Sequence, residues 1–203
     1  ECISDETIES IFTYIDNLLV QSNENEVDVL IGGPPCQAYS TAGRGRLPDK
    51  MQKDERNYLY LQYIKFLERY QPKMFVFENV VGIFSAQGGK VLVDMKEKID
   101  SAGYKIHVQV INAGGIGVLQ NRKRVIIRGV RKDIAINLKD IYFSDDQEKF
   151  SLRELWSDLP KLHAGESING EVYTSIPNAC CQLLNLRDRH CDILTWHVSR
   201  PHN

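Results

Sequence analysis

The sequence predicts an α/β fold with a parallel sheet, because two buried strands are separated and followed by helices. Residues 27–31 and 74–77 are short apolar runs with the β-branched and aromatic content of buried strands. Around them, apolar residues return every three or four positions, as in amphipathic helices. Strands and helices that alternate in this way are typical of parallel strands joined by crossover helices.

The remaining elements follow from the same periodicities. We expect helices at 5–21, at 57–71 and from 88 to 103, and further strands at 104–111 and 125–128. Pro72 ends the second helix, since the residue before a proline disfavours helical backbone, and Gly103 ends the third. From about residue 144 the pattern weakens into loops and short segments. We therefore expect one domain over 1–150 and a second over 151–203.

Composition limits the classes of function. With 42% hydrophobic and 26% charged residues, the chain is expected to be globular. No apolar run approaches the roughly 20 residues of a membrane span, and no signal peptide is recognisable. A net charge of −2 means that a nucleic acid would bind through a local basic patch. Five cysteines without a CxxC pair indicate reduced thiols in the cytoplasm, and no common zinc-site spacing is present, so we expect no metal.

The candidate nucleophile is Cys36, which follows the first strand. Residues 32–35 are Gly-Gly-Pro-Pro, which neither continue a strand nor start a helix interior, so Cys36 sits on a stiff turn. Such strand ends display reactive groups in open α/β sheets. A lone cysteine there is more often a packing residue. The residues that follow it, however, are polar or basic: Gln37, Ser40, Thr41, Arg44 and Arg46. Together they indicate a thiol beside an anionic substrate.

The candidate acid is Glu78, which follows the second strand as Cys36 follows the first. Because parallel strands end at the same sheet edge, the thiol and the carboxyl should share one crevice. A carboxyl beside an apolar core is poorly solvated, which disfavours its charged form and suits a general acid. Arg122 and Arg124 alternate in an extended segment, so both should face one side and could bind anionic or carbonyl oxygens. Taken singly, each of these residues is more often an ordinary surface residue.

Four motifs occur in a fixed order. They are Gly-Gly-Pro-Pro-Cys-Gln at 32–37, Asp-Glu-Arg-Asn-Tyr-Leu at 54–59, Glu-Asn-Val at 78–80 and Gly-Val-Leu-Gln-Asn-Arg-Lys-Arg at 117–124. Together they resemble the bacterial C5-cytosine DNA methyltransferases, from about residue 28 to 131 and more weakly beyond. The resemblance implies a partial Rossmann-like sheet, S-adenosyl-L-methionine as cofactor, double-stranded DNA as partner and the start of a target-recognition domain at 151–203. The implied setting is a restriction–modification system in the bacterial cytoplasm.

The resemblance also implies a mechanism on a cytosine flipped out of the duplex. Cys36 would attack C6 of the base, Glu78 would hold and protonate N3, and Arg124 would hold O2. C5 would then accept the methyl group, lose its proton and release Cys36. Arg122 would support the cysteine loop or contact a DNA phosphate.

Other residues would contact DNA or the cofactor by the same resemblance. Those expected at the DNA are Gln37, Ser40, Arg44, Arg46 and Gln120. Three of them, Ser40, Arg44 and Arg46, would belong to a mobile loop that closes over the duplex. Pro35 and Leu59 match positions close to the methyl end of the cofactor.

Two features depart from the family pattern. Leu119 stands where the family has a proline, a mild change within a turn. More importantly, the family's glycine-rich cofactor motif, its acidic cofactor-binding residues and its closing motifs have no counterpart in this sequence. We therefore expect a fragment or one piece of a split enzyme, which needs a missing N-terminal segment or a partner polypeptide. The isolated chain should bind the cofactor weakly and be inactive.

Three other functions stay open. One is the same chemistry on transfer RNA, although Ala-Tyr-Ser at 38–40 looks more like the DNA enzymes. Another is a truncated module that binds DNA without catalysis. The last is a cysteine hydrolase, which would need a histidine base that no recognisable triad supplies.

Overall fold

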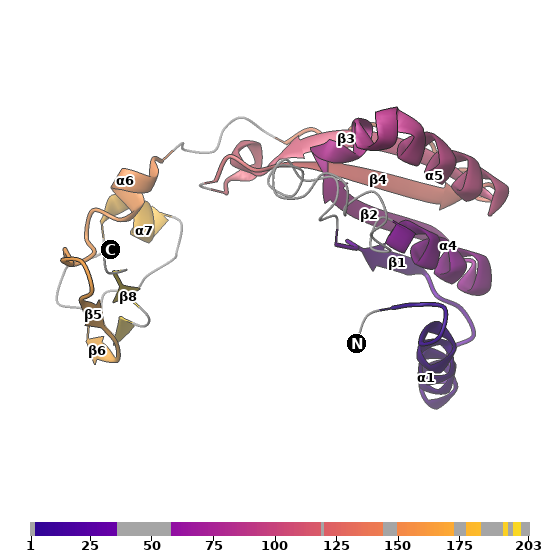
Figure 1. Ribbon diagram of the computed structural model, residues 1–203, viewed down its shortest axis with the longest axis horizontal. Coiled ribbons are helices and arrows are strands. Elements are labelled where there is room, and N and C mark those ends of the chain that lie inside the picture. The colour runs from indigo at the N-terminus through magenta and orange to yellow at the C-terminus, as the bar shows by residue number, and fades with distance from the viewer. Residues whose placement is uncertain are drawn as a thin grey trace. The chain divides into compact units, whose positions relative to one another are not determined.

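The computed structural model describes residues 3–35, 58–118, 120–143, 150–172, 178–183, 193–194 and 197–199. Two compact units are present: one comprises Glu1–Ile116 with Asn121–Ser144, and the other Gly117–Gln120 with Asp145–Asn203. The first contains the sheet and its helices, and the second contains short elements only (Figure 1). Within the described ranges, no helix is long and apolar enough to cross a membrane.

The first unit is built on a four-stranded sheet in the order β1-β2-β4-β3. Its strands are β1 (Val29–Gly32), β2 (Met74–Val80), β3 (Tyr104–Asn112) and β4 (Lys123–Arg131). The mixed α/β class agrees with the sequence prediction, and β1 and β2 are parallel as expected. The last strand, β4, lies between β2 and β3 and is antiparallel to both. The sheet is therefore mixed rather than wholly parallel.

Three helices complete this unit. They are α1 (Ile8–Gln21), α4 (Leu59–Tyr70) and α5 (Lys90–Ser101). Helices α4 and α5 lie against one face of the sheet (Figure 1). The apolar residues of α5 that the periodicity predicts are all buried: Val91, Leu92, Met95 and Ile99. They belong to one core with Phe75 and Phe77 of β2 and with Val125 and Ile127 of β4.

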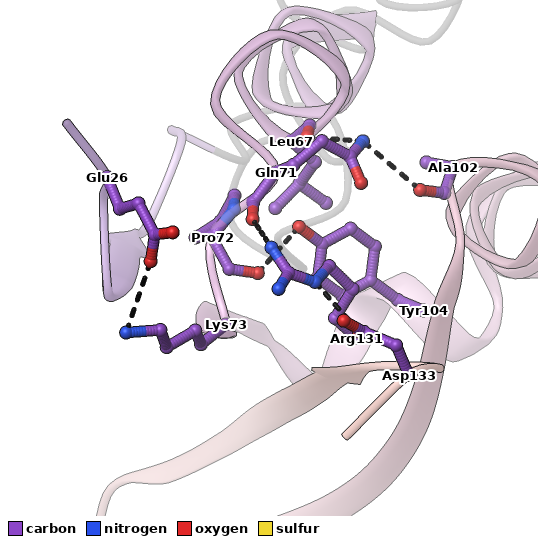
Figure 2. Close-up of polar contacts among 9 residues, drawn as sticks. All are labelled: Glu26, Leu67, Gln71, Pro72, Lys73, Ala102, Tyr104, Arg131 and Asp133. Atoms are coloured by element: carbon purple, nitrogen blue, oxygen red, sulfur yellow. Dashed lines mark hydrogen bonds and ion pairs between the residues drawn. The ribbon is translucent and has the colours of Figure 1, made fainter.

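The end of α4 is fixed by polar contacts at the start of β2. Gln71 adopts a left-handed conformation (φ 43°, ψ 49°) and caps the helix through its backbone N–H, which donates to the Leu67 carbonyl. Its side-chain amide donates to the carbonyls of Leu67 at 3.1 Å and Ala102 at 3.4 Å. Arg131 Nη1 donates to the Gln71 carbonyl at 2.6 Å (Figure 2). The side chain and the backbone of Gln71 therefore join α4 to the end of α5 and to the end of β4.

A buried tyrosine reinforces the same region. The Tyr104 side chain at the start of β3 is 1% exposed, and its hydroxyl donates to the Pro72 carbonyl at 2.8 Å (Figure 2). Burial raises the pKa of Tyr104 to about 12. This cluster lies where β2 begins, at the opposite end of that strand from Glu78.

The second unit consists of short elements. They are α6 (Leu152–Leu155), β5 (Ser167–Ile168), β6 (Glu171–Val172), α7 (Ala179–Leu183), β7 (Ile193–Leu194) and β8 (His197–Val198). Ser151 and Glu154 form a capping box at α6. Asn178 connects the two helices, because its Nδ2 donates to the Glu154 carbonyl at 2.6 Å and its Oδ1 accepts from the Cys181 N–H at 2.8 Å. Among the described residues, no three acidic, cysteine or histidine side chains are grouped so as to hold a metal.

Candidate active site

The loop after β1 approaches the end of β2. Gly32 pairs with Phe77 in the parallel register, so the chain leaves β1 beside Glu78. A Cβ atom built on Gly33 would lie 2.9 Å from Glu78 Oε2 and 3.6 Å from the Glu78 Cβ. A side chain at Gly33 would therefore push against the carboxylate. Cys36, three residues further along, falls in the gap between the described ranges 3–35 and 58–118.

Glu78 forms an ion pair with Arg124 across the β2–β4 pairing. Glu78 is opposite Ile126 and Val80 is opposite Arg124, so the two charged side chains come from neighbouring positions on one face of the sheet. Arg124 Nε lies 2.5 Å from Glu78 Oε1, and the Glu78 side chain is 43% exposed. The expected poor solvation of this carboxyl is therefore wrong. The carboxyl is partly exposed and contacts a guanidinium group.

Tyr63 of α4 holds the ends of β1 and β2 together. Its hydroxyl lies 3.1 Å from the carbonyl oxygens of both Leu30 and Val76. Its ring leaves no space beside Gly32, where an added Cβ would lie 2.6 Å from Tyr63 Cε2. Burial raises the pKa of Tyr63, so the hydroxyl stays a hydrogen-bond donor. From the sequence, Tyr63 is predicted only as part of the apolar stripe of its helix. The hydroxyl group within that stripe is the one sequence feature that could have indicated hydrogen bonding to the strands.

Asn79 supports the turn that follows Glu78. Its side chain is buried, and its Oδ1 accepts a hydrogen bond from the Val80 N–H at 2.8 Å. The chain then enters a short 3-10 helix, Val81–Phe84, whose Ile83 is fully buried. A second 3-10 turn, Ala86–Gly89, leads into α5. The backbone on both sides of Glu78 is thus anchored.

An apolar cavity of about 550 Å³ lies beside the loop after β1. Its walls include Leu30, Ile31, Pro35, Leu59 and Gln62, so the two residues expected near the cofactor line one space. This volume is typical of small-molecule sites. Within the described part of the chain, Gln62 Oε1 is buried and has no hydrogen-bond partner. Apolar walls with one unsatisfied acceptor fit the base or methyl end of a nucleoside cofactor, and Gln62 is a lining residue that the sequence did not single out.

The other predicted site residues are not part of the Glu78–Arg124 contact as the structure describes it. Arg122 precedes β4, so strand alternation does not apply to it; its side chain is exposed and its carbonyl accepts from the Ala113 N–H at 2.9 Å. Ala113 begins the 3-10 turn Ala113–Ile116, which follows β3. Gln120 is exposed and belongs to the other compact unit. The remaining candidates, Gln37, Ser40, Arg44 and Arg46, lie in the segment 36–57, which the structure does not describe.

Comparison with solved structures defines the class of fold. The chain aligns with a prophage-encoded Escherichia coli protein assigned as a DNA modification methyltransferase, with a TM-score of 0.57 and 23% identity. The alignment covers 85% of this chain and 43% of that one. The mixed sheet is thus part of a methyltransferase fold.

The sequence comparisons are more specific. Residues 5–179 match the family model of the C-5 cytosine-specific DNA methylases, and the chain belongs to this family. It is 41% identical over 162 residues to the type II methyltransferase M.Bpa9945I of Bacillus paralicheniformis, covering 73% of this chain and 36% of the relative. It is 39% identical over 155 residues to the type II methyltransferase M1.HphI of Haemophilus parahaemolyticus, covering 75% of this chain and 40% of the relative. The chain therefore spans well under half of either relative.

Proposed function

We propose that this chain carries the base-binding part of a DNA (cytosine-5)-methyltransferase of a bacterial restriction–modification system. One observation carries the proposal: Gly33 of the cysteine loop, Glu78 and Arg124 converge at the shared end of β1 and β2. A carboxyl and a guanidinium held side by side can bind the N3 and O2 edge of a cytosine, where proton donors are required. The named relatives support the substrate class, because both are type II methyltransferases.

Cys36 acts as the nucleophile in this proposal. A cytosine inside the duplex is inaccessible to attack above and below its ring, so the base must flip out into the site. The Cys36 thiolate adds to C6 while Glu78 donates a proton to N3, which makes C5 nucleophilic. After C5 has accepted a methyl group, it loses its proton to solvent, and the electron pair of that C–H bond forms the C5–C6 double bond. The C6–sulfur bond then breaks, Cys36 leaves as a thiolate, and N3 returns its proton to Glu78.

Arg124 has two successive partners in this scheme. In the free protein its guanidinium is bound to the Glu78 carboxylate. To serve N3, the Glu78 carboxyl must exchange its contact with the guanidinium for a contact with the base. We infer that Arg124 turns toward O2 of the base when cytosine enters, which frees the Glu78 carboxyl to bind N3. Arg122, exposed just before β4, would support the loop or contact a phosphate.

The cavity beside β1 is the proposed cofactor site. When bound, S-adenosyl-L-methionine supplies the methyl group. Pro35 and Leu59 would contact the cofactor through apolar surface, and Gln62 Oε1 would accept a hydrogen bond from a donor of the ligand. Carboxylates that could bind ribose hydroxyls are not among the described lining residues. The site thus provides only part of the contacts that such a cofactor needs, and we expect weak binding by this chain alone.

Additional polypeptide should complete the site by pairing with β1. This strand has a free edge in the described sheet, and its residues Val29 and Ile31, on the sheet face opposite Phe75 and Phe77, are 48% and 74% exposed. Exposed apolar edge strands readily pair with other strands. We propose that an N-terminal segment or a partner polypeptide adds a strand here and supplies the missing cofactor contacts. Residues 36–57, with Gln37, Ser40, Arg44 and Arg46, together with Gln120, would contact the DNA.

Methyl transfer to two acceptors tests the proposal. The chain is combined with the cofactor-binding segment of a related type II methyltransferase and offered labelled S-adenosyl-L-methionine with duplex DNA or transfer RNA. We expect label on C5 of cytosine in DNA, dependent on Cys36 and lost in Cys36→Ala. Label on transfer RNA alone would support the alternative substrate. DNA binding without any transfer would support a non-catalytic module.

A further inference from the structure

An extended segment after β4 returns across the sheet. We call residues 135–143 the strap. The turn before it is fixed by the Lys132 N–H, which donates to the Gly103 carbonyl at 2.8 Å. Lys139 lies beside Arg128 of β4. Ile141 lies beside Gln109, which is paired with Ile126, two residues earlier in β4 than Arg128. The strap therefore runs antiparallel to β4, back toward the end of the sheet that carries Glu78.

Gln109 binds both backbone groups of one strap residue. Its Nε2 donates to the Ile141 carbonyl at 2.8 Å, and its Oε1 accepts from the Ile141 N–H at 2.9 Å. A neighbouring strand would satisfy a residue in the same way, but here a single side chain does so. The orientation of the amide is fixed, because exchanging its oxygen and nitrogen would break both bonds.

Two further side chains fasten the strap just before Ile141, one row farther from Glu78 than Gln109. Arg128 Nη2 donates to the Lys139 carbonyl at 2.5 Å and lies 3.4 Å from Gln109 Oε1. His107 Nε2 lies 2.7 Å from Asp140 Oδ1. His107 and Gln109 alternate along β3, and Arg128 is paired directly with His107, so all three side chains project from one face of the sheet. This is the face opposite α4 and α5.

The fastening point is level with the candidate active site. Gln109 is paired with Ile126, and Ile126 is paired with Glu78. The three residues form one row across β3, β4 and β2, and directly paired residues share a face. Gln109 is therefore about 10 Å from Glu78, the width of two strand spacings. The strap is thus held on the Glu78 face, at the Glu78 level.

We propose that Gln109 is a positioning residue that fastens the strap, so that the chain leading to residues 151–203 departs from beside the catalytic edge. Without it, the strap would keep its contacts at Lys139 and Asp140 but would lose its attachment at Ile141, the contact that lies level with Glu78. A recognition unit that is tethered at a fixed point samples fewer positions, so less conformational freedom is lost when it binds DNA. The functional part of this inference rests on the proposed methyltransferase activity; the fastening itself does not.

Hydrogen exchange tests the fastening in this chain directly. In Gln109→Ala the Ile141 N–H loses its acceptor, and we expect its exchange to accelerate about tenfold or more. Gln109→Glu keeps an acceptor oxygen and should retain most of the protection. The matched control is Lys105→Ala, an exposed residue four positions earlier on the same face of β3. Amides of β2 should be unchanged in all three variants, which shows that the sheet is intact. Equal Ile141 exchange in wild type and Gln109→Ala would overturn the proposal.

The consequence for function is tested in the reconstituted enzyme. We expect Gln109→Ala to raise KM for DNA by about tenfold while kcat at saturating DNA is nearly unchanged, because the reacting groups stay in place. Lys105→Ala should change neither constant. A fall in kcat at unchanged KM would refute the positioning role. If no methyl transfer occurs even with wild-type chain, the proposed function fails, but the exchange experiment still decides whether Gln109 fastens the strap.

Discussion

Arg124 Nε lies 2.5 Å from Glu78 Oε1, and this ion pair joins β4 to β2 at the end where the cysteine loop begins. The pair occupies the position in which we propose that a cytosine binds. It therefore holds both groups beside the proposed base site before the substrate arrives, and in our proposal Arg124 then exchanges Glu78 for O2 of the base.

In the reconstituted enzyme, Arg124→Met should abolish most methyl transfer. The substitution keeps a long apolar side chain but removes the donor to O2 and the partner of Glu78, and we expect a loss of about 100-fold in kcat. Lys123→Met, at the exposed neighbouring position, is the matched control and should remain active. Single-turnover methylation of duplex DNA measures both. An Arg124→Met enzyme as fast as the control would contradict the role given to this side chain.

Gly33→Ala should damage the site without unfolding the protein. Its new methyl group would lie 2.9 Å from Glu78 Oε2, so the carboxylate must move. Small displacements of a catalytic group lower rates by up to about 100-fold. Gly115→Ala is the control, because nothing lies within 4 Å of a Cβ built there. Thermal unfolding should be alike in both variants; equal methylation rates as well would show that the close approach does not matter.

Tyr63→Phe should loosen the junction of β1 and β2. It removes the hydroxyl that both the Leu30 and the Val76 carbonyls approach. Losing one buried hydrogen-bonding group costs about 1–3 kcal/mol of unfolding free energy. Urea denaturation measures the loss, with Tyr14→Phe, whose side chain is 64% exposed, as the control. If the two variants were equally stable, the tyrosine hydroxyl would not support the strands.

Stability should decline at alkaline pH through Tyr104. Its pKa is raised from 10.0 to about 12 in the folded chain, so the unfolded chain loses the phenolic proton first. The stabilising contribution is complete below pH 10 and is lost as the pH rises toward 12. Urea midpoints measured across this window should fall less steeply in Tyr104→Phe than in wild type. A residual slope is expected, since burial also raises the pKa of Tyr63. Identical slopes in both proteins would exclude Tyr104 as a source of the stability lost at alkaline pH.

Local periodicity could predict much of this fold. The apolar stripe of α5 and the alternation of burial along β2 follow directly from residue spacing. The shared edge of β1 and β2 followed from the rule that parallel strands end together, and the approach of Gly33 to Glu78 agrees with it. The place of β4 between β2 and β3 could not be read in this way, because strand order depends on long-range pairing.

The environment of the site residues was harder to predict for the same reason. The sequence predicts a poorly solvated Glu78 carboxyl, and this prediction is wrong. Its partner Arg124 is 46 residues away in sequence, and only the β2–β4 register brings the two side chains together. Tyr63 and Gln109 look like ordinary helix and strand residues in sequence. Their roles depend on backbone carbonyl and amide groups from distant segments, which sequence spacing does not locate.

The most direct test of the account is the covalent step at Cys36. The reconstituted enzyme is incubated with cofactor and a duplex that carries 5-fluorocytosine, which cannot lose a proton from C5, and the trapped adduct is digested for mass spectrometry. We predict that the base is attached to the peptide that contains Cys36, in lower yield for Glu78→Gln and not at all for Cys36→Ser. An adduct on another cysteine, or an undiminished adduct in Cys36→Ser, would contradict the central claim.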